Sequence, residues 1–247
     1  MTKIAFYGHG LPGFTRTKPL PGRFVVLEGT DGVGRSTQIA LLREWLERSG
    51  YAVAVTGLKR SDLAAKGIRK AMSGHTLSDI TMNLFYATDM VDRLERQIIP
   101  ALRAGFVVLT DRYIYSIIAR AQVRGLDPTW LRNVFGFALV PDQVFYLQAD
   151  VPHLIPRVLN VREFDYWESG MDLLSQYDYH DAFVEYQSRL LAQYGAMVPE
   201  YGFHTVDATQ DIGDVFLTLQ DEITTLLADI KPIRTRDDEK EERKRKK

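Results

Sequence analysis

The stretch from Phe24 to Thr37, FVVLEGTDGVGRST, limits the possible folds of this chain more than any other. A short apolar run, typical of a buried strand, gives way to glycines and then to Arg35-Ser36-Thr37, where a helix is expected to begin. The spacing Gly29-x-x-x-x-Gly34-Arg35-Ser36 matches the phosphate-binding loop G-x-x-x-x-G-K-[ST], except that arginine replaces lysine. Such a loop turns backbone N–H groups and the positive end of a helix toward phosphate oxygens. We expect the basic side chain to reach the outer phosphates and the Ser36 hydroxyl to help hold Mg²⁺. The alternative is a plain glycine turn between a strand and a helix.

Strand-like and helix-like segments alternate along the rest of the chain. The predicted strands are 24–28, 51–56, 106–109, 143–148 and 203–206. The predicted helices are 36–49, 63–72, 77–104, 112–123, 128–139, 151–161, 178–198 and 211–229. This order predicts an α/β fold, a five-stranded parallel sheet with helices on both faces, in which ligands sit at the carboxyl ends of the strands. We expect an N-terminal extension over 1–22, one domain over 23–230 and a charged, disordered tail over 231–247.

Composition removes several functional classes. A chain of 247 residues with 45% apolar residues suits one α/β domain, and its net charge of −1 favours neither nucleic acid nor membrane surfaces as partners. The chain has no cysteine, which excludes disulfides and thiol catalysis and argues against a structural zinc site. The histidines are scattered without metal-binding spacing, so we expect structural or surface roles for them. We expect a cytoplasmic protein without a membrane partner, in which only the basic end of the tail could contact nucleic acid, weakly.

A second motif, Asp111-Arg112-Tyr113, ends the apolar strand predicted over 106–109. A carboxylate at that strand end lies beside the phosphate loop, where it can bind Mg²⁺ directly or through water. Arg112 follows it into the cleft, where it can hold a second phosphate group. The alternative is that Asp111 caps the next helix and Arg112 forms a surface ion pair.

Five segments together resemble the thymidylate kinases, in order and in spacing. They are FVVLEGTDGVGRSTQ, LFYATD, VVLTDRYIYS, DQVFYLQADV and HTVDATQ, and the resemblance covers about residues 23–228. It implies a P-loop NTPase of the nucleoside monophosphate kinase type that is a homodimer. It also implies transfer of the γ-phosphoryl group of ATP to the 5′-phosphate of dTMP with Mg²⁺, under a mobile lid expected near 160–172. Because a nucleotide phosphate is already ionised near neutral pH, such a site needs no general base. It must position two anions and neutralise their charge.

The resemblance also assigns residues to roles. The ATP phosphates would contact Gly29, Thr30, Asp31, Gly32, Val33, Gly34, Arg35, Ser36 and Thr37. Mg²⁺ would be held by Ser36 and Asp111. The acceptor would contact Arg69, Tyr86, Met90, Arg112, Ser116 and Arg120, with Tyr86 at the place that stacks on the base. The catalytic group would be Asp31, Arg35, Arg112 and Arg162.

The sequence departs from the family pattern in the loop and in the acceptor pocket. Arg35 keeps the charge of the loop lysine but carries a broader, planar guanidinium. Met90 stands where the family has an arginine that hydrogen-bonds the base, and the loss of such a donor should cost specificity. Ile117 and Arg120 stand where a polar and an aromatic residue are common. Met90 and Ile117 fit core positions equally well, so both interpretations stay open.

Two further departures concern cations. The family usually has Arg-Glu-Pro after the second strand, whereas this chain has Thr56-Gly57-Leu58-Lys59-Arg60. Here Lys59 and Arg60 either partly replace the arginine or are surface cations. In the lid, Tyr166 replaces an arginine, which leaves Arg157 and Arg162. An arginine that meets the transferring phosphoryl group is worth about three to five decades in rate in related enzymes.

Three functional hypotheses follow. The leading one is an ATP- and Mg²⁺-dependent kinase with a dTMP-like acceptor. The second is a nucleotide-binding regulatory or scaffold protein with little catalysis, suggested by Arg35, Met90 and Tyr166. The third is a P-loop kinase that acts on another small anionic acceptor.

Overall fold

Five parallel strands form the central sheet of this protein. The computed structural model describes residues 5–14, 20–161 and 163–232. The strands are β1 (Arg23–Glu28), β2 (Val53–Gly57), β3 (Val107–Asp111), β4 (Gln143–Gln148) and β5 (His204–Asp207). Their spatial order is β2-β3-β1-β4-β5, and every pairing is parallel. The predicted α/β class and five-stranded parallel sheet are confirmed.

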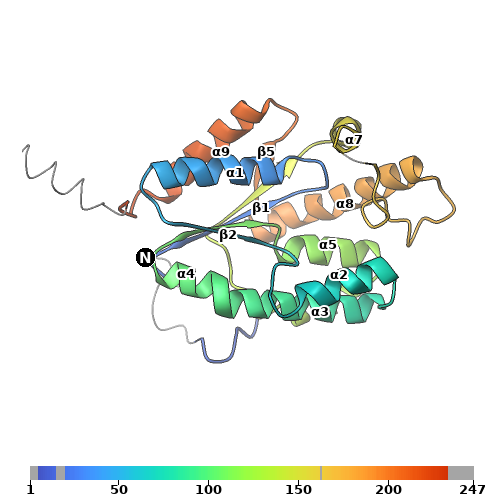
Figure 1. Cartoon of the computed structure of the whole chain (residues 1–247), viewed down its shortest axis with the longest axis horizontal. Coiled ribbons are helices and arrows are strands. Elements are labelled where there is room, and N and C mark those ends of the chain that lie inside the picture. The colour runs from blue at the N-terminus through green and yellow to red at the C-terminus, as the bar shows by residue number, and fades with distance from the viewer. Residues whose placement is uncertain (1–4, 15–19, 162, 233–247) are drawn as a thin grey trace, which may run out of the picture.

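Helices cover both faces of the sheet, as the sequence predicts (Figure 1). They are α1 (Arg35–Arg48), α2 (Ala65–Gly74), α3 (Asp79–Arg93), the π-helical turn η1 (Leu94–Ile98), α4 (Ile99–Arg103), α5 (Ile114–Val123), α6 (Pro128–Val134), α7 (Val151–Leu159), α8 (Tyr179–Tyr201) and α9 (Ile212–Leu226). Helices α1 and α9 lie on one face, and α4, α5 and α8 lie on the other. Phe24 and Val26 of β1 pack toward the second face and Val25 and Leu27 toward the first. This double burial explains why the strand is an unbroken apolar run.

The register of the three strands beside the phosphate loop brings their carboxyl ends together. Leu27 of β1 pairs with Asp111 of β3, which in turn pairs with Gly57 of β2. The segments that follow these strands therefore start at one edge of the sheet, where parallel α/β folds bind their ligands.

The helix predicted over 128–139 is shorter in the structure. Helix α6 ends earlier, and the residues after it pair with the N-terminal segment instead. The Gly8 N–H donates to the Gly136 carbonyl at 2.8 Å, and Phe6 forms an antiparallel bridge with Leu139. Phe6 is buried, so residues 5–14 of the predicted extension contain at least one anchor in the core. This pairing satisfies backbone groups that a longer helix would have used internally.

The long helix predicted over 77–104 is divided into α3, η1 and α4, and its apolar residues differ in burial. Leu94 and Ile98 are buried, but Ile80 and Leu84 are 56% and 47% exposed. A π-helical turn shifts the residues beyond it around the helix axis. In addition, α3 turns polar side chains inward, among them Asp89, which accepts backbone N–H groups of the segment after β2.

Other expectations stay predictions. The boundaries at 22/23 and 230/231 are untested, and from residue 233 onward the charged tail lies outside the described residues. Within the described residues, the helices are all too short or too polar to cross a membrane. The cytoplasmic location stays a prediction from the sequence.

Candidate active site

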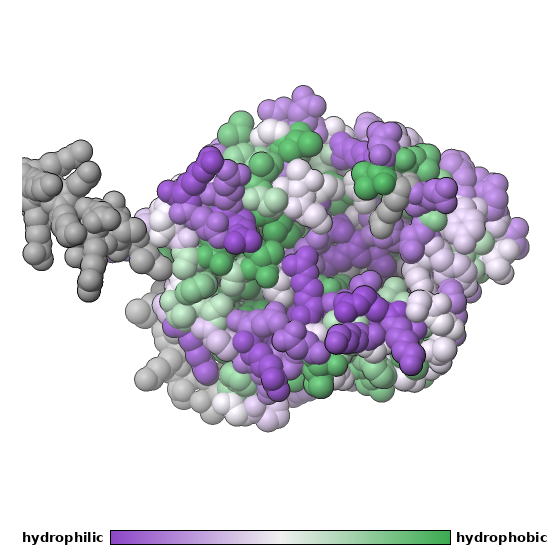
Figure 2. All heavy atoms as spheres, viewed as in Figure 1, coloured by the Kyte–Doolittle hydropathy of each residue, from purple (hydrophilic) through white to green (hydrophobic). Residues whose placement is uncertain are grey.

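A cavity of about 920 Å³ lies beyond the carboxyl ends of β1, β2 and β3. It is lined by the glycine loop, the segment after β2, parts of α3, α5 and α7, and the segment after β5. Figure 2 shows it as a hollow surrounded largely by hydrophilic residues, below α7 in this view. The volume and polarity suit charged ligands of nucleotide size.

The glycine loop has the backbone that a phosphate-binding loop requires. Gly29, Gly32 and Gly34 have φ angles of 144°, 79° and 96°, which side-chain-bearing residues rarely adopt. A Cβ at Gly29 would lie 2.5 Å from the Leu147 carbonyl oxygen, so the loop also needs glycine for lack of space. Gly34 is the N-cap of α1, and none of the described side chains caps that helix. The first N–H groups of α1 are thus left for an anion.

Most of the loop residues assigned to ATP line the cavity. These are Asp31, Gly32, Val33, Gly34, Arg35, Ser36 and Thr37. Gly29 and Thr30 lie behind them: Thr30 is 1% exposed, and its hydroxyl has no hydrogen-bond partner among the described residues. Their contribution is to the loop backbone.

The Arg35 guanidinium turns back under the loop. Its Nη1 donates to the carbonyls of Gly29, at 2.6 Å, and Thr30, and its Nε donates to Asp111 Oδ1 at 2.8 Å. Burial alone would lower the pKa of Arg35, but the charges of Asp111 and Asp31 raise it, so the side chain stays charged. Within the described structure Nη2 has no partner, and Arg35 lines the cavity. One nitrogen is therefore left for a phosphate oxygen.

The two residues predicted to hold Mg²⁺ are in direct contact. The Ser36 hydroxyl donates to Asp111 Oδ2 at 2.8 Å, while Oδ1 of the same carboxylate is held by Arg35. Burial by itself would raise the pKa of Asp111, but the charges of Arg35 and Arg112 outweigh it and lower the pKa. A hydroxyl and an ionised carboxylate are hard oxygen ligands of the kind Mg²⁺ prefers, so this pair fits the ion.

Two further arginines of the cavity lining share one carboxylate of the loop. Arg112 donates to Asp31 Oδ1, and Arg120 donates to Oδ2 at 2.6 Å. Burial would raise the pKa of Asp31, yet the charges of Arg112, Arg120 and Arg35 hold it far below its ordinary value. Arg112 has a left-handed backbone, φ 69°, and its N–H donates to the Leu27 carbonyl at 3.0 Å. The predicted second cationic group is thus present, and Arg120 belongs to it.

The remaining residues assigned to the acceptor divide into two sets. Tyr86 lines the cavity, and so does Ile117, which was named only as a departure from the family pattern. Met90 is fully buried, its sulfur lies 3.4 Å from Arg93 Nη2, and it does not line the cavity, which favours the core interpretation. Arg69 lies outside the cavity lining and donates to the Lys59 carbonyl.

Ser116 is also fully buried, because it belongs to a cluster around Glu28. Glu28 accepts from the Tyr113 N–H at 2.7 Å, from the Ser116 hydroxyl and from the Tyr194 hydroxyl at 3.0 Å. Burial raises the pKa of Glu28. This cluster ties β1 to the start of α5 and so positions Arg112, which lies between β3 and α5. Sequence reasoning missed it, although a glutamate that ends an apolar run, FVVLE, was a signal.

The segment between α7 and α8, where the sequence predicts a lid, packs against the C-terminal end of α2. The Trp167 indole donates to the Met72 carbonyl at 3.2 Å and stacks on His75. Arg157 lines the cavity and donates to the Ala208 carbonyl at 2.7 Å. Arg162, predicted to be catalytic, lies outside the described residues. Sequence reasoning missed Arg124, which lines the cavity and forms a bidentate pair with Asp172 of the lid.

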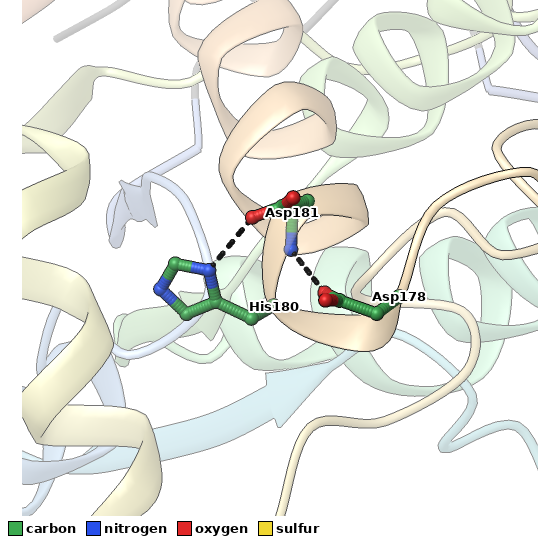
Figure 3. Close-up of side chains that lie close together, drawn as sticks. All are labelled: Asp178, His180 and Asp181. Atoms are coloured by element: carbon green, nitrogen blue, oxygen red, sulfur yellow. Dashed lines mark hydrogen bonds and ion pairs between the residues drawn. The ribbon is translucent and has the colours of Figure 1, made fainter.

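Asp178, His180 and Asp181 lie together at the start of α8 (Figure 3), with ligand atoms within 4.8 Å of one another. All three are exposed, and none lines the cavity. Asp178 caps the helix by accepting from the Asp181 N–H at 2.9 Å, and His180 contacts Asp181. These contacts are accounted for by helix capping.

Comparison with known proteins agrees with this geometry. A parallel sheet in this order, with a phosphate loop after its central strand and a second cationic group in the same cavity, defines a P-loop nucleoside monophosphate kinase. The model of the thymidylate kinase family matches residues 27–216. This chain belongs to the thymidylate kinase family, whose reaction is the ATP-dependent phosphorylation of dTMP.

Several curated relatives are similar over most of their length. The probable thymidylate kinase 2 of Saccharolobus solfataricus is 34% identical over 201 residues, which cover 81% of this chain and 94% of the relative. The probable thymidylate kinase of Thermococcus gammatolerans is 34% identical over 206 residues, 78% of this chain and 92% of the relative. The thymidylate kinase of Bifidobacterium longum subsp. infantis is 32% identical over 220 residues, 85% and 89% of the two chains.

Proposed function

We propose that this chain transfers the γ-phosphoryl group of ATP to dTMP inside the cavity. The observation that carries the proposal is the presence of two cationic groups in the cavity: the loop with Arg35, and the cluster of Arg112 and Arg120 on Asp31. They suit a donor and an acceptor phosphate. Because the acceptor phosphate is ionised already, these residues need only orient two anions and neutralise their charge.

On the donor side, the loop N–H groups and Arg35 Nη2 bind the phosphates of ATP. Ser36 and Asp111 would hold Mg²⁺, which neutralises charge on the phosphate oxygens when bound. Because Arg35 already orients Asp111, this carboxylate loses little conformational entropy when it binds a cation. Arg157 supplies a further cation from α7, and the role of Arg162 stays a prediction from the sequence.

On the acceptor side, Arg112 and Arg120 bind the phosphate of dTMP, and Tyr86 provides a ring beside the base. Arg112 is held in a left-handed backbone conformation by β1 and by the Glu28 cluster. Such a conformation costs about 1–3 kcal/mol, so it is kept only where the surroundings enforce it. It directs Arg112 into the cavity before any ligand arrives.

The test is a turnover assay with ATP, Mg²⁺ and a panel of nucleoside monophosphates. We expect dTMP to be phosphorylated fastest, and Arg112→Gln to lose about 10²-fold or more in kcat/KM for dTMP, through loss of a bidentate cation. Arg132→Gln is the matched control, because Arg132 forms an exposed pair with Glu200 outside the cavity lining.

Two alternatives are separated by the same assay. Met90 lies in the core rather than at a base edge, which favours relaxed acceptor choice. A faster acceptor than dTMP would support the kinase with another acceptor. ATP binding by a folded protein without turnover on any acceptor would overturn the kinase proposal in favour of a nucleotide-binding regulatory protein.

A homodimer is the second part of the proposal. Helix α3 exposes Ile80 and Leu84, and Leu63 in the segment before α2 is 70% exposed, while the inward residues of α3 are mostly polar. A helix with its apolar side toward solvent favours an interaction surface. We expect a dimer by size-exclusion chromatography with light scattering, and a monomer for Leu84→Glu. Leu217→Glu, at an exposed leucine of α9, should leave the mass unchanged. A monomeric wild type would contradict the proposal.

A further inference from the structure

Lys59 has an unusual backbone for a residue with a side chain. Its φ is 60°, and in the described part of the chain only His75 and Arg112 share a positive φ without being glycine. Lys59 and Arg112 follow neighbouring strand ends, since Gly57 of β2 pairs with Asp111 of β3. Two strained cations at adjacent strand ends point to a function, because a glycine would adopt either conformation without strain.

The surroundings hold Lys59 in this conformation. Its N–H donates to Asp89 Oδ2 at 3.2 Å, and its carbonyl accepts from Arg69 Nη1 at 3.3 Å. Asp89 is fully buried and forms an ion pair with the equally buried Arg93 at 2.9 Å. The backbone is therefore fixed from below by a buried pair of α3, and the side chain is left to project from it.

Among the described residues, the hydrogen-bond partner of the Lys59 ammonium group is a sulfur and not a carboxylate. Lys59 is half-buried and lines the cavity, and the nearest polar contact of Nζ is the Met72 sulfur at 3.7 Å. Among the described residues, no carboxylate lies within ion-pair distance of Nζ. Burial and then the charges of Arg120 and Arg112 lower the pKa of Lys59, and Asp31 and Glu168 offset only part of this effect.

Charge counting shows what this group of residues lacks. Lys59, Arg112 and Arg120 carry three positive charges. The negative charges that act on Lys59 are those of Asp31, whose two oxygens are taken by the two arginines, and Glu168. Like charges that are kept together in a partly buried cavity raise the free energy unless an anion joins them. Positive charge therefore remains in excess, which suits a phosphate group as the ligand.

We propose that Lys59 determines acceptor specificity by binding the phosphate of the acceptor, together with Arg112 and Arg120. The proposal rests on the proposed function for the identity of the acceptor, a nucleoside monophosphate. It adds a third cation to the acceptor phosphate site and selects a doubly charged phosphomonoester over an uncharged nucleoside.

The experiment measures the dissociation constants of dTMP and of thymidine without ATP, for the full chain and for four variants. Lys59→Gln should weaken dTMP binding by about 10- to 100-fold, the usual effect of removing one charged hydrogen-bond partner, and thymidine binding by less than about twofold. Lys59→Arg should keep most of the affinity for dTMP. Lys66→Gln, at an exposed lysine of α2 outside the cavity lining, should behave as wild type.

Lys59→Gly separates binding from folding. It removes the ammonium group and also the backbone strain, so it should lose dTMP affinity as Lys59→Gln does while its melting temperature stays at or above that of the wild type. In turnover assays, the KM for dTMP should rise more than kcat falls.

Two results would overturn the inference. One is dTMP binding by Lys59→Gln within twofold of the wild type. The other is an equal loss of affinity for dTMP and thymidine, which would assign Lys59 to the base or to folding. Failure of the proposed function looks different: the wild type would not turn over dTMP, whereas the contrast between dTMP and thymidine binding would still be measurable.

Discussion

Replacing Arg35 by methionine or lysine tests whether this arginine braces the phosphate loop. Its guanidinium donates three hydrogen bonds, one to Asp111 and two to loop carbonyls, and the side chain is 9% exposed. Methionine fills a similar volume without any donor, and lysine keeps the charge on a single nitrogen. Methionine therefore removes the charge and all three hydrogen bonds, whereas lysine keeps the charge and removes the planar arrangement of several donors.

The expected loss of stability follows from these contacts. Removing one partner of a buried ion pair costs about 3–5 kcal/mol, and here the lower end applies because Asp111 keeps Ser36 and is partly exposed. We expect Arg35→Met to lose about 3 kcal/mol in the free energy of unfolding at pH 7. Arg35→Lys, which can hold Asp111 or the carbonyls but not both, should lose about 1–2 kcal/mol. For a chain of this size these losses correspond to about 9 °C and about 4 °C in Tm.

The assay is urea unfolding together with steady-state turnover and ATP binding. Arg35→Met should lose both ATP affinity and turnover, because the loop loses its brace and its only side-chain cation. Arg35→Lys should be less stable than the wild type but keep turnover within about tenfold, since its ammonium can still approach a phosphate. Arg43→Met is the matched control on α1, where an exposed pair with Glu47 is worth less than about 1 kcal/mol. If the free energy of unfolding of both variants were within about 0.5 kcal/mol of the wild type, the conclusion that Arg35 stabilises the phosphate loop would be refuted.

The remaining predictions concern three residues near the site. Burial raises the pKa of Glu28 above 4.5, so the folded protein favours the protonated carboxyl. The stability that Glu28 contributes is therefore fully present below pH 4.5 and is lost as the pH rises through the folded pKa. Glu28→Gln should remove this loss, and urea unfolding from pH 4 to 8 that shows parallel curves for both proteins would contradict it. A Cβ at Gly32 would lie 2.7 Å from Val158 Cγ2, so Gly32→Ala should displace α7 and lower both Tm and kcat; an unchanged kcat would argue against this contact. Met90→Arg should lower Tm strongly, because it places a charge beside buried Arg93, and should not tighten dTMP binding; tighter binding at an unchanged Tm would return Met90 to the acceptor pocket.

The sequence predicted those parts of the site that local patterns encode. The strand, the glycines and the start of α1 are contiguous, so spacing alone places Ser36 and Arg35 at the loop. Asp111 and Arg112 follow directly from an apolar strand whose position beside β1 is common in this class of sheet. Contacts between distant segments were not encoded in this way. The Glu28 cluster joins residues more than eighty positions apart, and nothing in the local pattern announces Ser116 or Tyr194 as its partners.

The sequence also could not predict which residues on one side of a helix reach the cavity and which are buried in the core. Tyr86 and Met90 are four residues apart and share one side of α3, which is why a common pocket was a reasonable hypothesis. Four residues also advance about 6 Å along the helix axis. In the structure, this distance separates Tyr86 in the cavity lining from Met90 in the packed core.

The position of Arg35 explains how an arginine can serve where the motif has lysine. A lysine ammonium is one point charge, so it either reaches a phosphate or holds groups beneath the loop. The guanidinium divides these tasks among its nitrogens: Nε orients Asp111, Nη1 donates to two loop carbonyls, and Nη2 has no partner among the described residues. Since Asp111 is oriented through Oδ1, its Oδ2, now bonded to Ser36, is the oxygen left to receive a cation. The substitution therefore couples the loop, the carboxylate and the donor phosphate through one side chain, and for that reason a change at Arg35 should alter stability and ATP binding together.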